Sequence, residues 1–247
     1  MKLIYAIVFS FFLMCCQKKG SNNCEDIQNI YVSYNGPVTI GDSLKIYTQE
    51  VGGYRIYSWR GPDNFMSQQP RNTIFDVQLK NEGWYYLTLS NNECDTKVDS
   101  IYADVKLQQG IPSCSVPNNN CTFNNLANDS YYSIQKRYDP TYGFLNLECI
   151  GTNDLDIFFH DYWKTHEPED GIYKTTNIPS FTLDKNYNKV FISTIKSSIY
   201  FKTYEGQTVY VSHVNGKLQV RFCNLSMAGT NNSFNYVTVA SGNLTQQ

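Results

Sequence analysis

The chain has 247 residues, a formal net charge of −2, 41% hydrophobic residues and 17% charged residues. This apolar content is enough for one or two packed cores and excludes a disordered chain, and the near-neutral charge argues against a nucleic-acid-binding protein, which needs a basic surface for phosphates. Aromatic residues make up 15% of the chain, with 20 Tyr among them, and they favour strands because flat side chains pack well on a pleated sheet. We therefore expect an all-β protein.

The first sixteen residues are typical of an export signal. Lys2 gives a basic start, and the apolar run that follows is too short to cross a bilayer as a helix. The run ends in Leu13-Met14-Cys15-Cys16, which resembles the lipobox of bacterial lipoproteins, where a Leu lies three residues before the cysteine that receives the diacylglycerol. The resemblance implies that residues 1–15 are a signal peptide and that Cys16 is lipidated. The alternative is an ordinary cleaved secretory signal with two incidental cysteines.

Residues 16–23 are expected to be the lipidated cysteine and a polar tether. Gln17-Lys18 resembles the start of the signal that directs Bacteroidetes lipoproteins to the outer face of the outer membrane, although Lys19 and Gly20 stand where that signal has acidic residues. We expect a protein held on the outer membrane by its lipid, because acyl chains give a stable membrane anchor. Whether it faces the periplasm or the cell surface stays open.

Six cysteines remain after Cys15 and Cys16 are set aside: Cys24, Cys94, Cys114, Cys121, Cys149 and Cys223. An even number in an exported chain indicates disulfides, with 15 possible pairings. None of the six lies in a CxxC pair, which argues against a structural zinc site. The alternative is that some of them are free, buried thiols.

Residues 24–107 are predicted to form an antiparallel sandwich of short strands. Residues 44–48 carry apolar side chains on one face, apolar residues alternate at Phe75, Val77 and Leu79, and the pattern resumes after Gly83. Residues 101–107 also alternate with a period of two, which favours a strand over a helix.

Two stretches of this region resemble the Ig-like and PKD-like repeats of Bacteroidetes surface proteins. The stretch Tyr57-Ser-Trp59-Arg-Gly61-Pro62 is similar to their tryptophan strand, and residues 79–87 resemble the D-x-G-x-Y-x-C pattern of the tyrosine corner, with Asn81 for Asp and Leu87 for Cys. The resemblance implies an Ig-like sandwich, a core anchored by Trp59, and a buried Tyr85 whose hydroxyl bonds to the backbone. Because Leu87 replaces the cysteine of the usual inter-sheet bridge, that bridge is absent here. The Ig-like architecture that the resemblance implies suggests a pair of Cys24, before the first strand, with Cys94, in the turn after the Tyr85 strand.

Two Pro, one Gly and a run of Asn mark residues 108–120 as a linker that Cys114 could stiffen. Residues 121–247 are again rich in strands, and Asn215-Gly216 between two alternating segments predicts a type I′ hairpin. This region loosely resembles the C-terminal β domains of uncharacterised Bacteroidetes lipoproteins. We expect a second antiparallel β-sandwich or a barrel-like domain there.

The densest group of polar side chains lies at residues 160–171. His160, His166 and Glu167 are candidate ligands for a divalent metal, and the carboxylates of this stretch raise the distant alternative of a metal-dependent hydrolase. No zinc-protease or EF-hand spacing occurs, so the alternative is a solvated loop, and we expect no cofactor. His213, in a strand beside a turn, is expected to be structural or exposed.

The surplus of Tyr favours a second function, glycan binding, because sugars stack on aromatic rings. The candidate rings are those of Tyr162, Trp163, Tyr200 and Tyr204. The leading interpretation is a non-enzymatic lipoprotein on the membrane that acts as a structural, adhesion or interaction module, with a protein or a glycan as its partner and no nucleic acid. Glycan binding by the C-terminal domain is the alternative.

Overall fold

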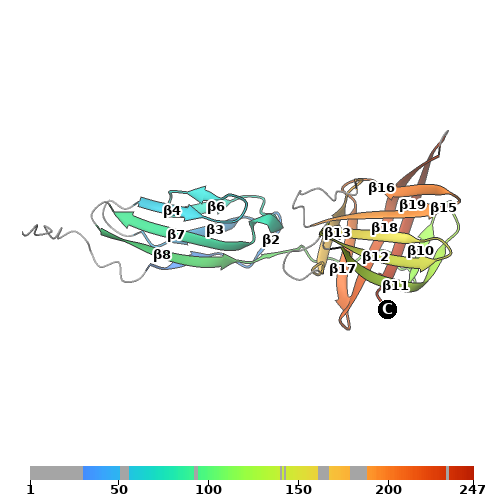
Figure 1. The fold of residues 1–247 in the computed structure, drawn as a ribbon, viewed down its shortest axis with the longest axis horizontal. Helices are drawn as coiled ribbons and strands as arrows, with labels where there is room; N and C mark the ends of the chain where they lie inside the picture. The colour runs from blue at the N-terminus through green and yellow to red at the C-terminus, as the bar shows by residue number, and fades with distance from the viewer. Residues whose placement is uncertain are drawn as a thin grey trace, which may run out of the picture.

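The computed structural model describes residues 30–50, 56–91, 94–139, 141, 143–160, 167–178, 188–231 and 234–247. Within these residues the secondary structure is strand apart from one 3-10 helix at Leu79–Asn81, so the all-β prediction is confirmed. Two lobes follow one another along the long axis of the molecule (Figure 1). In the described part of the chain, no helix has the length and apolarity needed to span a membrane.

The first lobe consists of two antiparallel sheets and one small parallel pair. One sheet has the order β1 (Val32–Tyr34), β3 (Leu44–Thr48), β6 (Arg71–Ile74), and the other has the order β5 (Met66–Ser67), β4 (Ile56–Arg60), β7 (Gly83–Asn91), β8 (Cys94–Ala103). β2 (Val38–Thr39) pairs in parallel with β9 (Val105–Lys106). The core contains Leu44 and Ile46 from the first sheet and Trp59, Tyr85 and Leu87 from the second. The lobe is therefore a sandwich.

Tyr85 and Trp59 occupy the places that the Ig-like resemblance implies. Tyr85 is fully buried and its hydroxyl donates a hydrogen bond to the Asn81 carbonyl at 2.8 Å, which is the tyrosine-corner arrangement. The Trp59 indole is also buried and donates to the Gln69 carbonyl at 2.9 Å. The absence of a side chain at Gly61 lets the Tyr85 ring approach the backbone closely, since a Cβ at residue 61 would lie 2.4 Å from that ring. The Ig-like sandwich is thus confirmed by its own geometry.

The alternation at Phe75, Val77 and Leu79 does not form a strand, so that prediction is wrong. β6 ends at Ile74, Asp76 has a positive φ of 49°, and Leu79 begins the 3-10 helix. A positive φ interrupts the extended backbone that a strand requires. Phe75 is exposed as a result, whereas Val77 and Leu79 still reach the core.

The second lobe is one large sheet that closes on itself. The strands, taken around the ring, are β13 (Leu155–His160), β12 (Phe144–Gly151), β11 (Asp129–Asp139), β10 (Asn120–Phe123), β19 (Phe234–Thr245), β18 (Lys217–Asn231), β16 (Ile199–Thr203) and β15 (Lys189–Lys196). Pairing of β15 with β13 completes an antiparallel ring of eight strands. Of the two forms expected for this region, the barrel-like one is therefore observed.

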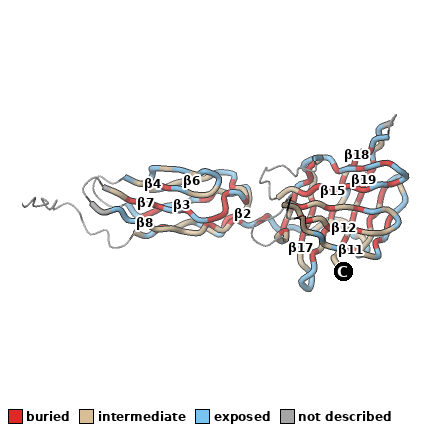
Figure 2. The backbone as a smooth tube through the Cα atoms, viewed as in Figure 1, coloured by how far each residue is buried: buried red, intermediate tan, exposed pale blue. Residues whose placement is uncertain are grey.

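Two further strands, β14 (Gly171–Thr175) and β17 (Thr208–Val214), bridge β15 and β18 at one end of the ring. β14 runs parallel to β15 and antiparallel to β17, and β17 pairs with the first half of β18. Asn215 and Gly216 join β17 to β18 with φ values of 52° and 75°, as the predicted type I′ hairpin requires. Buried residues alternate with more exposed ones along many strands of both lobes (Figure 2).

Candidate functional site

Several residues singled out in the sequence lie outside the described part of the structure. These are Cys16, Cys24, Tyr162, Trp163 and His166. His160 ends β13 and Cys94 begins β8, but the side chains of both are also outside the described residues. The lipidation of Cys16, the Cys24–Cys94 disulfide and a metal site at His160 and His166 therefore stay predictions.

Glu167, the one candidate metal ligand whose side chain is described, belongs to a cluster of charged groups. His213 on β17 contacts Glu167 through Nε2 at 3.1 Å and Asp170 through Nδ1 at 2.6 Å. Lys136 on β11 forms an ion pair with the other Glu167 oxygen. All four side chains are partly exposed, so each pair contributes little to stability by itself. Together they hold residues 167–170 against β17 and β11.

This cluster does not have the composition of a metal centre. Among the described residues, no group of three or more His, Cys, Asp or Glu side chains is arranged to hold a metal ion. Lys136 places a cation where a metal would have to bind Glu167. Sequence reasoning missed the pairing of His213 with Glu167 and Asp170 because the partners lie more than 40 residues apart in the chain.

The segment between the lobes is attached to the second lobe along much of its length. The Ile172 amide donates to the Gln108 carbonyl at 2.8 Å, and the Gln109 side chain donates to the Asp170 carbonyl at 2.9 Å. Leu107 packs so closely on Gly171 that a Cβ at residue 171 would lie 2.3 Å from the Leu107 Cβ. These contacts fix the direction in which the chain enters the second lobe.

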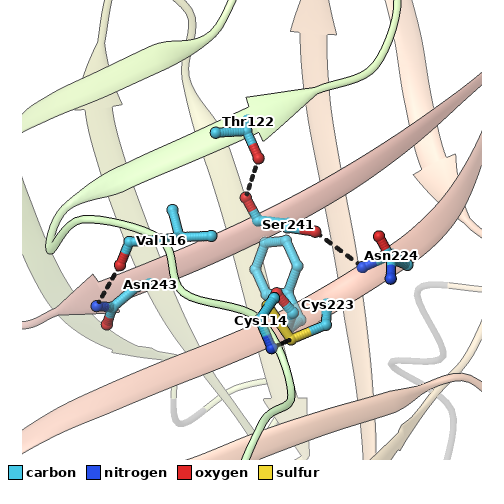
Figure 3. The surroundings of a disulfide bond; sticks show 8 residues. Cys114, Val116, Thr122, Cys223, Asn224, Ser241 and Asn243 are labelled. Carbon is cyan, nitrogen blue, oxygen red and sulfur yellow. Dashed lines mark hydrogen bonds between the residues drawn. A yellow bond between two sulfur atoms is a disulfide. The ribbon is translucent and has the colours of Figure 1, made fainter.

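A disulfide between Cys114 and Cys223 fastens the same segment to β18 (Figure 3). Beyond it, the Asn243 side chain donates to the Val116 carbonyl at 3.0 Å, so the segment is also bonded to β19. The prediction that Cys114 stiffens this segment is supported by these contacts. The disulfide joins residues 109 apart in the sequence, and its partner could not be identified from spacing alone.

A small pocket lies beside the disulfide and is lined by Pro112, Ser115, Val116, Arg221 and Asn243, among others. Its volume is about 140 Å³. Sites for small organic ligands enclose roughly 300–1,000 Å³. The pocket is therefore too small to bury such a ligand.

The remaining two described cysteines, Cys121 and Cys149, are free thiols buried inside the ring. Burial raises the pKa of both thiols above the usual range, because an apolar interior disfavours the thiolate. We expect neither to react with iodoacetamide at neutral pH while the protein is folded, and both to react in urea. Peptide mapping after alkylation measures this, and labelling of either residue in the folded protein would contradict the buried placement.

A cluster of exposed aromatic residues lies on the first lobe, on the outer face of the β4–β7–β8 sheet. Trp84 and Tyr86 on β7 are 51% and 48% exposed, and their rings stack with centroids 6.4 Å apart. Tyr102 on β8 lies opposite Trp84 and meets it edge-on at 5.6 Å. We call Trp84, Tyr86 and Tyr102 the aromatic strip. Sequence reasoning did not select it, although Trp84 and Tyr86 alternate with the buried Tyr85 and Leu87.

Of the four predicted glycan-binding residues, Tyr200 and Tyr204 are described. They are 46% and 44% exposed and lie four residues apart, in and just after β16. The exposed Ile195 on β15 pairs with Tyr200. No stacked ring pair of Tyr200 or Tyr204 is found among the described residues.

No protein-family model matches the sequence, and no curated protein matches it. Among solved structures, the chain is similar to the "Crystal structure of Dpr2 Ig1-Ig2 in complex with DIP-Theta Ig1-Ig3", at 12% sequence identity and a TM-score of 0.28. The similarity covers 85% of this chain and 59% of that one, so this chain spans less than two thirds of the length of its neighbour. The assignment of the first lobe as Ig-like accordingly rests on its own sheets and on Trp59 and Tyr85.

Proposed function

We propose that this protein is a non-enzymatic interaction module, anchored in the outer membrane through a lipid on Cys16, that binds a partner protein through the aromatic strip. The observation that carries the proposal is the stacked, exposed pair of Trp84 and Tyr86 on the outer face of the sheet. Large rings held in one place by a sheet provide contact area with little loss of conformational entropy on binding.

A protein partner suits the residues around the strip. Arg60 lies opposite Tyr86 on β4, and the exposed Met66 lies opposite Arg60 on β5. Trp, Tyr, Met and Arg are the residue types enriched in the centres of protein–protein interfaces.

A pair of photo-crosslinkable variants tests this proposal. A photoreactive amino acid at position 86 in the full-length protein, in intact cells, is expected to give one discrete crosslinked protein. The same amino acid at position 132, where Tyr132 is 72% exposed on the second lobe, serves as the matched control and should not give that product. We further expect Trp84→Ala to abolish the product at position 86. Equal products from both positions, or a product unchanged by Trp84→Ala, would refute the proposal.

The lipid anchor is tested separately. Cys16→Ser is expected to release the protein from the membrane fraction and to remove the acyl mass from the N-terminal peptide, because two or more acyl chains are what hold such a protein on a bilayer. Protease treatment of intact cells then distinguishes the two faces of the membrane. Full membrane retention of Cys16→Ser would contradict the anchor while leaving the aromatic strip as a binding surface.

Glycan binding is the second candidate, and the exposure of Tyr200 and Tyr204 favours it. Glycan-array binding by the purified full-length protein should then be lost in Tyr200→Ala/Tyr204→Ala and kept in Trp84→Ala. The distant alternative, a metal-dependent hydrolase at residues 160–170, is not favoured by Glu167, whose carboxylate is already paired with Lys136 and His213.

A further inference from the structure

A lysine and an aspartate are in direct contact inside the ring of the second lobe. Lys196, the last residue of β15, places its Nζ 2.7 Å from Oδ2 of Asp129, the first residue of β11. Their side chains are 3% and 1% exposed. β12 and β13 lie between β11 and β15, so the contact does not belong to any strand pairing.

Apolar and polar groups of the protein surround the pair. The Phe123 ring lies 3.8 Å from Nζ, and Nζ also donates a hydrogen bond to the Ala127 carbonyl. On the other side, the Asn153 side-chain amide donates to Asp129 Oδ1 at 2.8 Å. Moving two opposite charges out of water is costly, and an amide bond between the two groups would remove both charges.

An amine in contact with a carboxyl group provides the reactants of an amide-forming reaction, because a neutral amine is a nucleophile and the carbon of a protonated carboxyl is an electrophile. Holding both in contact replaces a reaction between two molecules by one within a single molecule, and such positioning corresponds to effective concentrations of about 10⁵–10⁸ M. The low exposure of both side chains limits the access of solvent to the pair.

We propose that Lys196 and Asp129 become joined by an intramolecular isopeptide bond. Nζ of Lys196 attacks Cγ of Asp129, and the negative charge that develops on Oδ1 is stabilised by the Asn153 amide that already bonds to it. In the proposed step Oδ2 takes up two protons from the Lys196 ammonium, one before the attack and one as the C–N bond forms, and leaves as water. One C–N bond forms, one C–O bond breaks, and no oxidant, reductant or cofactor is consumed.

The amide product keeps the hydrogen bonds of the pair. Its carbonyl oxygen, formerly Oδ1, still accepts from Asn153, and its single N–H still donates to the Ala127 carbonyl. The product is uncharged, so the cost of burying two charges disappears. The bond would connect residues 67 apart and link strands that are not neighbours in the ring.

Peptide mass spectrometry of the full-length protein tests the proposal. The protein is purified folded from the membrane, reduced, unfolded and digested. We expect one branched peptide that contains both Asp129 and Lys196, with a mass lower than the sum of its two parent peptides by one water molecule. Fragmentation should place the branch at these two residues, and the protease trypsin should fail to cleave after Lys196.

Two variants complete the experiment. Lys196→Met should lose the branched peptide, whereas Lys202→Met, which removes an exposed lysine on the neighbouring β16, should keep it. If Lys196→Met does not fold, the wild-type measurement still decides. Linear peptides alone in the wild-type protein would overturn the proposal. A branch at Asn153, recognised by loss of ammonia in place of water, would overturn the assignment to Asp129.

Discussion

Replacing Trp59 by alanine is expected to lower the free energy of unfolding of the first lobe by about 3–5 kcal/mol, as large-to-small changes in a core do. Trp59 is 1% exposed and lies between the two sheets, with Leu44 and Tyr85 in the same core. Its removal leaves a cavity and also leaves the Gln69 carbonyl without its indole donor. Urea unfolding followed by far-UV circular dichroism measures the loss.

Trp84→Ala is the matched control, because it removes the same side chain from the same sheet on its opposite face. Trp84 is 51% exposed, so the expected change in stability is small, about 0.5 kcal/mol, as for most surface substitutions. Equal losses in the two variants would contradict the assignment of Trp59 to the core and Trp84 to the surface. The same control confirms that any loss of binding in Trp84→Ala is not due to unfolding.

Cys114→Ser is expected to be the most destabilising change in the second lobe. The disulfide joins residues 109 apart, and the chain-entropy model assigns about 4–5 kcal/mol to closing a loop of that length. The variant should unfold at lower urea concentration than the oxidised wild-type protein, and reduction of the wild-type protein should produce a similar shift. Limited proteolysis should then cleave the segment between Gln108 and Val116.

A cysteine outside the disulfide provides the comparison. Cys121→Ser removes a buried free thiol and leaves the Cys114–Cys223 bond intact, so its unfolding should still respond to reductant. Cys114→Ser should lose most of that response. A reductant effect of the same size in both variants would indicate that other cysteines, such as Cys24 and Cys94, account for it.

The parts of the fold that depend on neighbouring residues could be predicted from the sequence. Asn215-Gly216 supports a positive φ at both turn positions, so the hairpin follows from two residues. Alternation placed Leu44 and Ile46 on a buried face, and the pattern around Tyr85 implied a buried ring with a backbone partner. The failure at Phe75 has an equally local cause, the positive φ of Asp76, which no hydrophobic pattern reveals.

The closure of the second lobe could not be predicted, because it depends on pairings between distant segments. β13 pairs with β15, which lies more than 30 residues further along the chain. β18 pairs with β17 over its first part and with β16 over a later part. The contact of Lys196 with Asp129 depends on that closure. The aromatic strip is different, because the alternation of residues 84–87 contained the signal that Trp84 and Tyr86 face outward.

The closed ring has a consequence for how the second lobe behaves in a crowded environment. In the described part of the chain, each of its eight strands pairs with a neighbour on both sides over at least part of its length. Open sheets invite edge-to-edge aggregation and strand exchange, and closing a sheet removes most of its free edge. We therefore expect the second lobe to aggregate less readily at high protein concentration than an open sheet of the same strands.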